Sequence, residues 1–284
     1  MTIDQKPGQE RHWLITGANS GFGTEFARAA LTAGDLVTAA VRRPETMAAL
    51  AAAYPGKLTV VKLDVTDPEQ CEEAVRAAVA EHGRIDVLVN NAGFGLVGAV
   101  EETTEPELRN AFEVMFFGAI RLTQLVLPHM RARRSGTIVQ VSSMGGFMSF
   151  PGVGAYSAAK GALELASEAL AGEVAPLGIR VLIVEPGAFR TEFTGSALQH
   201  ATVIDDYLDT VGAVRTGLPE SHGQQPGDPA KAADALIRAL ELPEPPLRLV
   251  LGEDAVSAVR DKLASVGAEL DRTAELSLST AFAD

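Results

Sequence analysis

Tyr156 and Lys160 stand four positions apart, a spacing that puts both side chains on one face of an α-helix. An ammonium group beside a phenol lowers the pKa of the phenol, so the pair could transfer a proton near neutral pH. Ser143 ends an apolar run and could hydrogen-bond the same substrate oxygen. On spacing alone, an ordinary tyrosine and lysine on a helix surface is the commoner explanation, so a catalytic role needs support from elsewhere in the chain.

A glycine-rich turn near the N-terminus offers a second kind of chemistry. It follows the apolar run Trp13–Thr16 and precedes a helical pattern. Glycines let the backbone turn sharply and approach a pyrophosphate, whose charge the free amides of a helix N-terminus can hold. A purely structural turn is the alternative. The residues expected to contact a dinucleotide here are Gly17, Asn19, Ser20, Gly21, Phe22 and Gly23.

Short apolar runs alternate with longer helical patterns over the first 190 or so residues. This alternation predicts an α/β fold in which parallel strands are joined by helical crossovers. The expected strands are Trp13–Thr16, Leu36–Val41, Leu58–Leu63, Val87–Asn90, Thr137–Ser142, Val181–Val184 and Leu247–Leu251. The expected helices include one capped by Asp67, one from Thr104 to about Arg133 that opens with a capping box, and one from about Tyr156 to Leu177.

The chain is expected to form one domain, because no stretch has the composition of a linker. Residues 1–11 are interpreted as a flexible tail and residues 12–284 as the domain. The Gly-rich, polar segment at about 188–228 is too long for an ordinary connection, so it is interpreted as a substrate lid. A helix over Glu253–Arg272 and a tail are expected after residue 252.

Charge and cysteine content restrict the possible partners. The chain has 24 basic and 37 acidic residues and a net charge of −13, which argues against a nucleic-acid partner. One cysteine, Cys71, cannot form an internal disulfide and has no zinc-ligand spacing around it, so no metal is expected. The N-terminus lacks the apolar core of a secretory signal. The uncharged stretch Ser135–Ala159 contains Gly, Ser and Pro, which suits a buried strand and loop better than a membrane span. A cytoplasmic protein is expected.

The chain resembles the short-chain dehydrogenase/reductase family from Trp13 to about Leu251. The motifs that carry the resemblance occur in the family's order and spacing: Thr-Gly-x-x-x-Gly-x-Gly at 16–23, Asn-Asn-Ala-Gly at 90–93, Ser143, Tyr-x-x-x-Lys at 156–160 and Pro-Gly at 186–187. The resemblance implies a doubly wound Rossmann fold with a central parallel sheet of about seven strands flanked by helices. It also implies a nicotinamide dinucleotide cofactor.

The resemblance further implies a role for each matching residue. Tyr156 would be the general acid or base, Lys160 would hold the nicotinamide ribose and lower the pKa of Tyr156, and Ser143 would orient the carbonyl. Other residues expected to bind the cofactor are Asn91, Ala92 and Gly93 after the fourth strand, Pro186, Gly187 and Thr191 beside the nicotinamide, and Asp64 and Val65 beside the adenine.

The end of the second expected strand indicates which cofactor is preferred. An NAD-dependent enzyme needs a carboxylate there for the ribose diol, and Val41 occupies the place where the family has it. Arg42 and Arg43 follow and offer a fork for a 2′-phosphate, with help from Ser20, so NADP(H) is predicted over NAD(H). The alternative is two solvated arginines.

One residue departs from the family pattern. Where the family has an asparagine that completes a proton relay, this chain has Met115, which cannot donate a hydrogen bond, although its backbone carbonyl could still hold a relay water. Met115 also continues an apolar helical stripe. We expect slower or differently relayed proton transfer. An alternative is a catalytically weak NADP(H)-binding sensor or partner module.

The sequence thus predicts an NADP(H)-dependent oxidoreductase that interconverts a ketone or aldehyde and an alcohol on an apolar small molecule. The apolar residues that could surround the reacting carbon are Phe94, Leu96, Phe147, Met148, Phe150, Phe189, Phe193, Leu198 and Tyr207. They could equally pack a core or a subunit interface. The apolar helices over 104–133 and 156–177 predict a homodimer or homotetramer.

Overall fold

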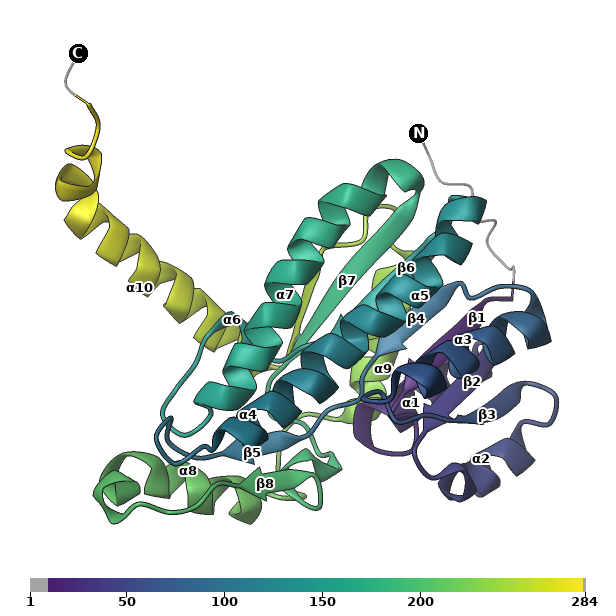
Figure 1. Ribbon diagram of the computed structural model, residues 1–284, viewed down its shortest axis with the longest axis horizontal. Helices are drawn as coiled ribbons and strands as arrows, with labels where there is room; N and C mark the ends of the chain where they lie inside the picture. Colours follow the sequence, from purple (N-terminus) through teal and green to yellow (C-terminus); the bar gives the residue numbers. More distant parts are fainter. Residues whose placement is uncertain (1–9, 283–284) are drawn as a thin grey trace.

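Seven parallel strands form the central sheet, in the order β3-β2-β1-β4-β6-β7-β9 (Figure 1). The structure is a computed structural model that describes residues 10–282. The strands are β1 (His12–Thr16), β2 (Leu36–Val41), β3 (Leu58–Lys62), β4 (Val87–Asn90), β6 (Gly136–Val141), β7 (Ile179–Pro186) and β9 (Arg248–Leu251). The predicted doubly wound α/β fold with seven strands is confirmed. The strand predicted over 181–184 is longer, because β7 pairs with both β6 and β9.

Helices cover both faces of the sheet (Figure 1). One face packs Trp13 and Ile15 of β1 against α1 (Gly21–Thr32) and α9 (Pro229–Glu241). The other face packs Leu14 of the same strand in a cluster with residues of α3 (Pro68–His82), α5 (Gly118–Arg133) and α7 (Gly154–Val174). Because alternate residues of each strand enter opposite cores, the strands are buried on both sides and read as continuous apolar runs.

The order of strands reverses at β1, which pairs with β2 on one side and β4 on the other. Loops leaving the carboxyl ends of these strands turn in opposite directions and leave a crevice, which is where open α/β sheets bind ligands. The glycine-rich turn after β1 and the Asn-Asn-Ala-Gly segment at the end of β4 therefore lie on the two sides of this crevice.

The helix predicted over 104–133 is interrupted. Thr104 and Glu107 make the predicted capping box, and the chain then forms α4 (Glu105–Phe112), a π-helical turn η2 (Glu113–Phe117) and α5. A wide π turn adds one residue to the helical repeat, which apolar periodicity does not reveal. The helix predicted over 156–177 begins earlier, as α7, and ends in the 3₁₀ turn η3 (Ala175–Leu177).

The 188–228 segment has regular structure of its own. It contains η4 (Glu192–Thr194), β8 (Leu198–His200), η5 (Asp205–Tyr207) and α8 (Leu208–Glu220). Strand β8 pairs in parallel with β5 (Gly95–Val97), so the segment is attached to the loop that follows β4. This two-stranded sheet is not predicted by the sequence, because each strand has three residues.

Shorter elements complete the chain: η1 (Pro44–Met47), α2 (Ala48–Ala53) and α6 (Met144–Phe147). The C-terminal helix α10 (Glu253–Leu278) extends six residues beyond the predicted end at Arg272. Most of the predicted tail over 1–11 lies outside the described residues. Within them, Arg11 forms an ion pair with Asp35.

The helical run Glu105–Arg133 is the one segment of residues 10–282 that is long and apolar enough to cross a membrane, by length and composition only. Its α5 part packs against α3, β4 and β6 and buries Leu122, Val126 and Met130. A helix that covers a sheet passes the same test, so the run is weak evidence for a membrane span.

Candidate active site

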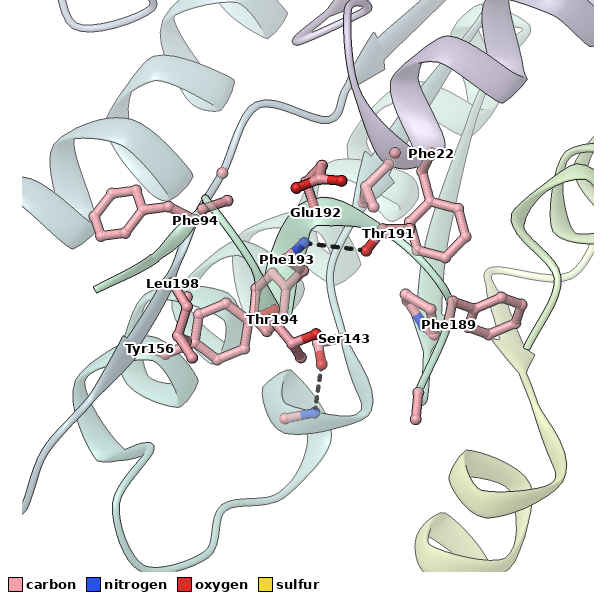
Figure 2. A pocket seen from close by; sticks show the side chains of 18 of the residues that line it. Phe22, Phe94, Ser143, Tyr156, Phe189, Thr191, Glu192, Phe193, Thr194 and Leu198 are labelled. Atoms are coloured by element: carbon pink, nitrogen blue, oxygen red, sulfur yellow. Dashed lines mark hydrogen bonds between the residues drawn. The ribbon is translucent and has the colours of Figure 1, made fainter. Parts of the chain in front are cut away.

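A cavity of about 250 Å³ lies at the carboxyl edge of the sheet (Figure 2). Thirteen of the predicted catalytic and cofactor-binding residues line it: Gly17, Ser20, Gly21, Phe22, Asn91, Ala92, Gly93, Ser143, Tyr156, Lys160, Pro186, Gly187 and Thr191. They come from the loops after β1, β4, β6 and β7, from the end of β7, and from helices α1 and α7. The topology therefore brings the glycine-rich turn and the Ser-Tyr-Lys group into one space.

Ser143 and Tyr156 meet at the floor of this cavity. Ser143 follows β6 and caps α6, where its Oγ accepts a 3.0 Å hydrogen bond from the Gly145 amide. Tyr156 lies in the first turn of α7 and lines the same cavity, where the Ser143 hydroxyl lowers its pKa against the effect of burial. Phe193 packs edge-on against the Tyr156 ring with centroids 5.3 Å apart (Figure 2). Two polar groups thus converge beneath an aromatic cover.

Burial is the largest cause of the pKa shifts of Tyr156 and Lys160, which both lie on α7. It raises the pKa of Tyr156 to about 12, against the lowering effect of the Ser143 hydrogen bond. It lowers the pKa of Lys160 to about 8, against the raising effect of Glu164. The sequence predicts that Lys160 lowers the Tyr156 pKa, and the structure differs: the Lys160 Nζ lies 6.0 Å from the phenol ring centroid and donates instead to the Val141 carbonyl.

Three glutamates surround Arg248, and one of them, Glu164, acts on the charge of Lys160. The guanidinium bonds Glu164 at 2.5 Å, Glu168 at 2.6 Å and also Glu185. Glu164 and Glu185 are buried, and burial raises the pKa of each. Burial opposes the charge of Arg248, but its hydrogen bonds to the three glutamates raise its pKa. One cation therefore faces three acidic groups.

Glu164 connects this cluster to the site. Its carboxylate accepts a 2.5 Å hydrogen bond from Ser142, the residue before Ser143, and it lies one helical turn after Lys160. The sequence analysis did not single out Glu164. The available signal was an acidic residue in an otherwise apolar and small-residue turn of the helix that carries Tyr156 and Lys160.

The glycine-rich turn is closely packed. Gly17 and Gly21 have φ of 62° and 50°, in the left-handed region that favours glycine. A Cβ on Gly23 would lie 2.2 Å from the carbonyl oxygen of Gly17, so no larger residue fits. Asn91 donates from Nδ2 to the carbonyl of Thr16 at 2.9 Å, which ties β4 to the turn. The side chain of Asn91 is thus engaged in holding the turn in shape.

Pro186, Gly187 and Thr191 lie on the other side of the cavity. Gly187 is held against β9 by a 2.9 Å bond from its amide to the Leu251 carbonyl. Thr191 faces the glycine-rich turn: a Cβ on Gly21 would lie 3.1 Å from the Cβ of Thr191. Figure 2 shows Thr191 with Phe22 close by at the same end of the cavity.

The remaining predicted cofactor residues do not line this cavity. Arg42 and Arg43 follow β2 and are exposed, and within residues 10–282 neither guanidinium has a hydrogen bond or ion pair. Asp64 follows β3 and accepts from Thr66, while Val65 is buried. All four lie at the same edge of the sheet as the cavity. Arg42 and Arg43 are one strand away from β1, and Asp64 and Val65 are two strands away. Two members of the glycine-rich turn, Asn19 and Gly23, are also outside the lining.

Met115 is a core residue in the π turn. It is 1% exposed and packs with Leu96, Ala111 and Ala159. A second cavity of about 10 Å³ lies between Met115, Lys160 and Asn90. This volume is close to the minimum that holds one water molecule.

Apolar side chains dominate the rest of the main cavity. Phe94, Leu96, Phe150, Phe189, Phe193 and Leu198 line it as predicted. Three other candidates are outside the lining: Met148, Phe147, which lies under the Arg248 guanidinium at 5.4 Å, and Tyr207, which donates to Glu101 at 2.5 Å. Leu218, Ser221 and Gln225 line it from the 188–228 segment and were missed, because no local pattern marks them.

Comparison with known proteins decides the family. Residues 11–202 match the family model described as short chain dehydrogenase. The chain belongs to this family. A short-chain dehydrogenase from Streptomyces avermitilis has the same fold, with 51% identity and a TM-score of 0.92 over 96% of this chain and 100% of that one.

Two curated relatives within the family are oxidoreductases by name. Oxidoreductase BOA17 of Botryotinia fuckeliana is 41% identical over 95% of this chain and 98% of its own length. A 3-ketodihydrosphingosine reductase of Bacteroides thetaiotaomicron is 37% identical over 84% of this chain and 87% of its own. The short-chain dehydrogenase described here is therefore an NAD(P)-dependent oxidoreductase.

Related structures contain either nicotinamide cofactor. A serine dehydrogenase complexed with NADP+ is 25% identical, with a TM-score of 0.73 over 84% of this chain and 94% of that one. A protein from Burkholderia phymatum in complex with NAD shares the fold, at 21% identity and a TM-score of 0.82 over 92% and 95% of the two chains. The tight glycine-rich turn, whose Gly23 position excludes a Cβ, fits such a dinucleotide in this chain.

Proposed function

We propose that this short-chain dehydrogenase is an NADP(H)-dependent enzyme that interconverts a ketone or aldehyde and an alcohol. The observation that carries the proposal is that Ser143, Tyr156 and the glycine-rich turn line one mostly apolar cavity. A proton donor and a dinucleotide site then face the same substrate. Residues of the 188–228 segment cover the cavity as a substrate lid.

The chain's residues handle the proton and the substrate oxygen. Tyr156, with its raised pKa of about 12, is protonated at neutral pH and donates its proton to the carbonyl oxygen during reduction. Ser143 holds the same oxygen by a hydrogen bond. Lys160, whose Nζ lies 6.0 Å from the phenol ring centroid, supplies positive charge to the site and would donate to the cofactor ribose. The nicotinamide cofactor, when bound at the glycine-rich turn, supplies or accepts the hydride.

The preference for NADP(H) rests on charge at the end of β2. Arg42 and Arg43 are exposed and have no ion pair within the described residues, so both are available to a 2′-phosphate. Val41 is buried and apolar where an NAD-dependent relative would present a carboxylate. Ser20 adds a hydroxyl from the glycine-rich turn. Asp64 and Val65, which follow β3, would border the adenine, and Thr191 would contact the nicotinamide carboxamide.

An apolar carbonyl compound fits the cavity best. Phe94, Phe193 and Leu198 line it, and Figure 2 shows Phe193 and Leu198 beside Tyr156. Apolar residues and glycines outnumber polar residues in the lining, which suits a substrate with a reacting oxygen and an apolar remainder. The name of the Bacteroides relative, a reductase of a keto compound, agrees with the reductive direction.

A substrate panel tests the function directly. The purified protein is mixed with NADPH or NADH and a series of apolar ketones and aldehydes, and with NADP+ and the matching alcohols, and nicotinamide absorbance is followed. We expect turnover with NADPH and at least one apolar ketone or aldehyde. Tight NADPH binding without turnover across the panel would contradict the proposal and favour the sensor or partner module that Met115 suggests.

Assembly and location complete the proposal. The exposed side chains of Phe117 and Leu165, on the helical run Glu105–Arg133 and on α7, support a homodimer or homotetramer through these helices. The acidic balance and the single buried cysteine support a cytoplasmic location.

A further inference from the structure

Helix α10 leaves the body of the molecule and extends away from it (Figure 1). Its base contacts β9 and α6, and Ala255 in the first turn is buried. Every residue from 260 to 273 is exposed. An isolated helix is marginally stable in water and gains most of its stability from packing one face. The outer turns of α10 therefore lack the contact that would stabilise them.

The direction of α10 is fixed at its base. The Asp254 carboxylate accepts a 2.7 Å hydrogen bond from the Ala188 amide, in the loop that borders the active-site cavity. A Cβ on Gly187 would lie within about 2.5 Å of the same carboxylate, so Asp254 fills the space that the glycine leaves. The base of α10 is therefore attached to the body, while its outer turns are unpacked.

An apolar stripe runs along the helix from its half-buried base into its exposed part. It consists of Val256, Val259, Leu263, Val266 and Leu270, whose spacing alternates between three and four residues. The last three side chains are 57%, 46% and 63% exposed. A 3.5-residue repeat keeps one face of a helix against a second helix over several turns, as in two-stranded coiled coils.

We propose that α10 pairs in antiparallel orientation with α10 of a second copy of this chain. In the register that places Leu263 opposite Val266 of the second copy, Val259 lies opposite Leu270. The stripe then forms successive apolar layers across the pair. This contact is separate from the active site and from the helices over 104–133 and 156–177, and it does not depend on the proposed function.

Charge complementarity selects the antiparallel orientation. Lys262 and Glu269 flank the stripe on the same side. In the antiparallel register, Lys262 of each copy faces Glu269 of the other, which gives two attractive pairs by symmetry. In a parallel pair the residues that face Lys262 and Glu269 are Gly267 and Ala274, which carry no charge. The antiparallel arrangement also places the two bodies at opposite ends of the pair.

The mass of the intact protein in solution tests the pairing. Light scattering is measured from about 1 to 100 μM on wild type, on Leu263→Glu/Leu270→Glu, and on Ser265→Glu/Ala268→Glu. The last variant adds the same charge to exposed positions of α10 outside the stripe. We expect the stripe variant to have half the mass of wild type, and the control to keep the wild-type mass.

Three results would overturn the pairing: a monomeric wild type over the whole range, an unchanged mass in the stripe variant, or an equal loss in the control. Thermal melting of each variant shows that the body remains folded, which is expected because both leucines are exposed.

Charge reversal tests the orientation. Lys262→Glu and Glu269→Lys should each raise the dissociation constant of the pair several-fold, because each places like charges opposite one another. Combining them restores attraction in the antiparallel register and should return the constant to near the wild-type value. A double variant as weak as the singles would overturn the antiparallel arrangement.

Discussion

Lys160 donates a 2.6 Å hydrogen bond from its Nζ atom to the carbonyl oxygen of Val141, the last residue of β6. The bond ties the middle of α7 to the strand that carries Ser143 just beyond its end. It uses one of the three donors of the ammonium group and leaves two for other partners. The sheet, rather than Tyr156, thus fixes the position of this charge in the structure.

Glu164 is expected to keep Lys160 protonated. Its charge raises the pKa of Lys160 against burial, which lowers it to about 8. Glu164→Gln removes this charge and retains an acceptor for Ser142, so the pKa of Lys160 should fall further. Activity that needs the ammonium form is then lost at lower pH. The alkaline limb of the kcat/KM profile should move down by roughly half a pH unit or more.

Glu168→Gln is the matched control for this profile. Glu168 bonds the same arginine, Arg248, but lies closer to solvent and does not contribute to the Lys160 pKa. Its alkaline limb should coincide with that of wild type. Equal profiles for the two glutamine variants would contradict the role given to Glu164.

Arg42→Ala tests the cofactor preference. Loss of one charge-assisted hydrogen bond to the 2′-phosphate should weaken NADPH binding by about 1.5–3 kcal/mol and leave NADH binding nearly unchanged. Titration of the purified protein with each cofactor measures both. Arg28→Ala, which removes another exposed arginine on α1, should alter neither. Equal losses for NADPH and NADH in Arg42→Ala would refute the assignment.

Met115→Asn tests whether the π turn has packed around methionine. Met115 is buried against Leu96 and Ala111, so an amide without partners should cost about 1–3 kcal/mol. The melting temperature should then fall by roughly 2–10 °C. Met115→Leu, which preserves the volume, should cost less. Retained stability with greater turnover would instead show that the surroundings still accept an asparagine. Met115 would then slow the proton relay without having changed the packing around it.

Much of the site could be predicted because its motifs lie at the ends of strands. Parallel strands end at one edge, so residues that follow β1, β4, β6 and β7 in sequence must be neighbours in space. The strands themselves are recognisable because burial on both faces leaves continuous apolar runs, as in Val87 to Val89.

The rest depends on contacts that no local pattern encodes. Arg248 and Glu164 are 84 positions apart in the chain. They come together because β9, which carries Arg248, pairs with β7. The Tyr156 pKa is raised because distant segments, including Phe193, bury the phenol. Strands β5 and β8 form only against each other, so neither is recognisable alone.

Replacement of Tyr156 by phenylalanine tests the central claim most directly. With NADPH and an apolar ketone that wild type reduces, Tyr156→Phe should lower kcat by roughly 10²–10⁴-fold, because the proton donor is lost. NADPH affinity should stay within about twofold, since the phenol contributes little of the cofactor binding energy. Tyr54→Phe is the control, because it removes an exposed hydroxyl that bonds Thr32 and does not line the cavity. It should behave as wild type. A Tyr156→Phe enzyme that binds NADPH and reduces the ketone at the wild-type rate would contradict the account.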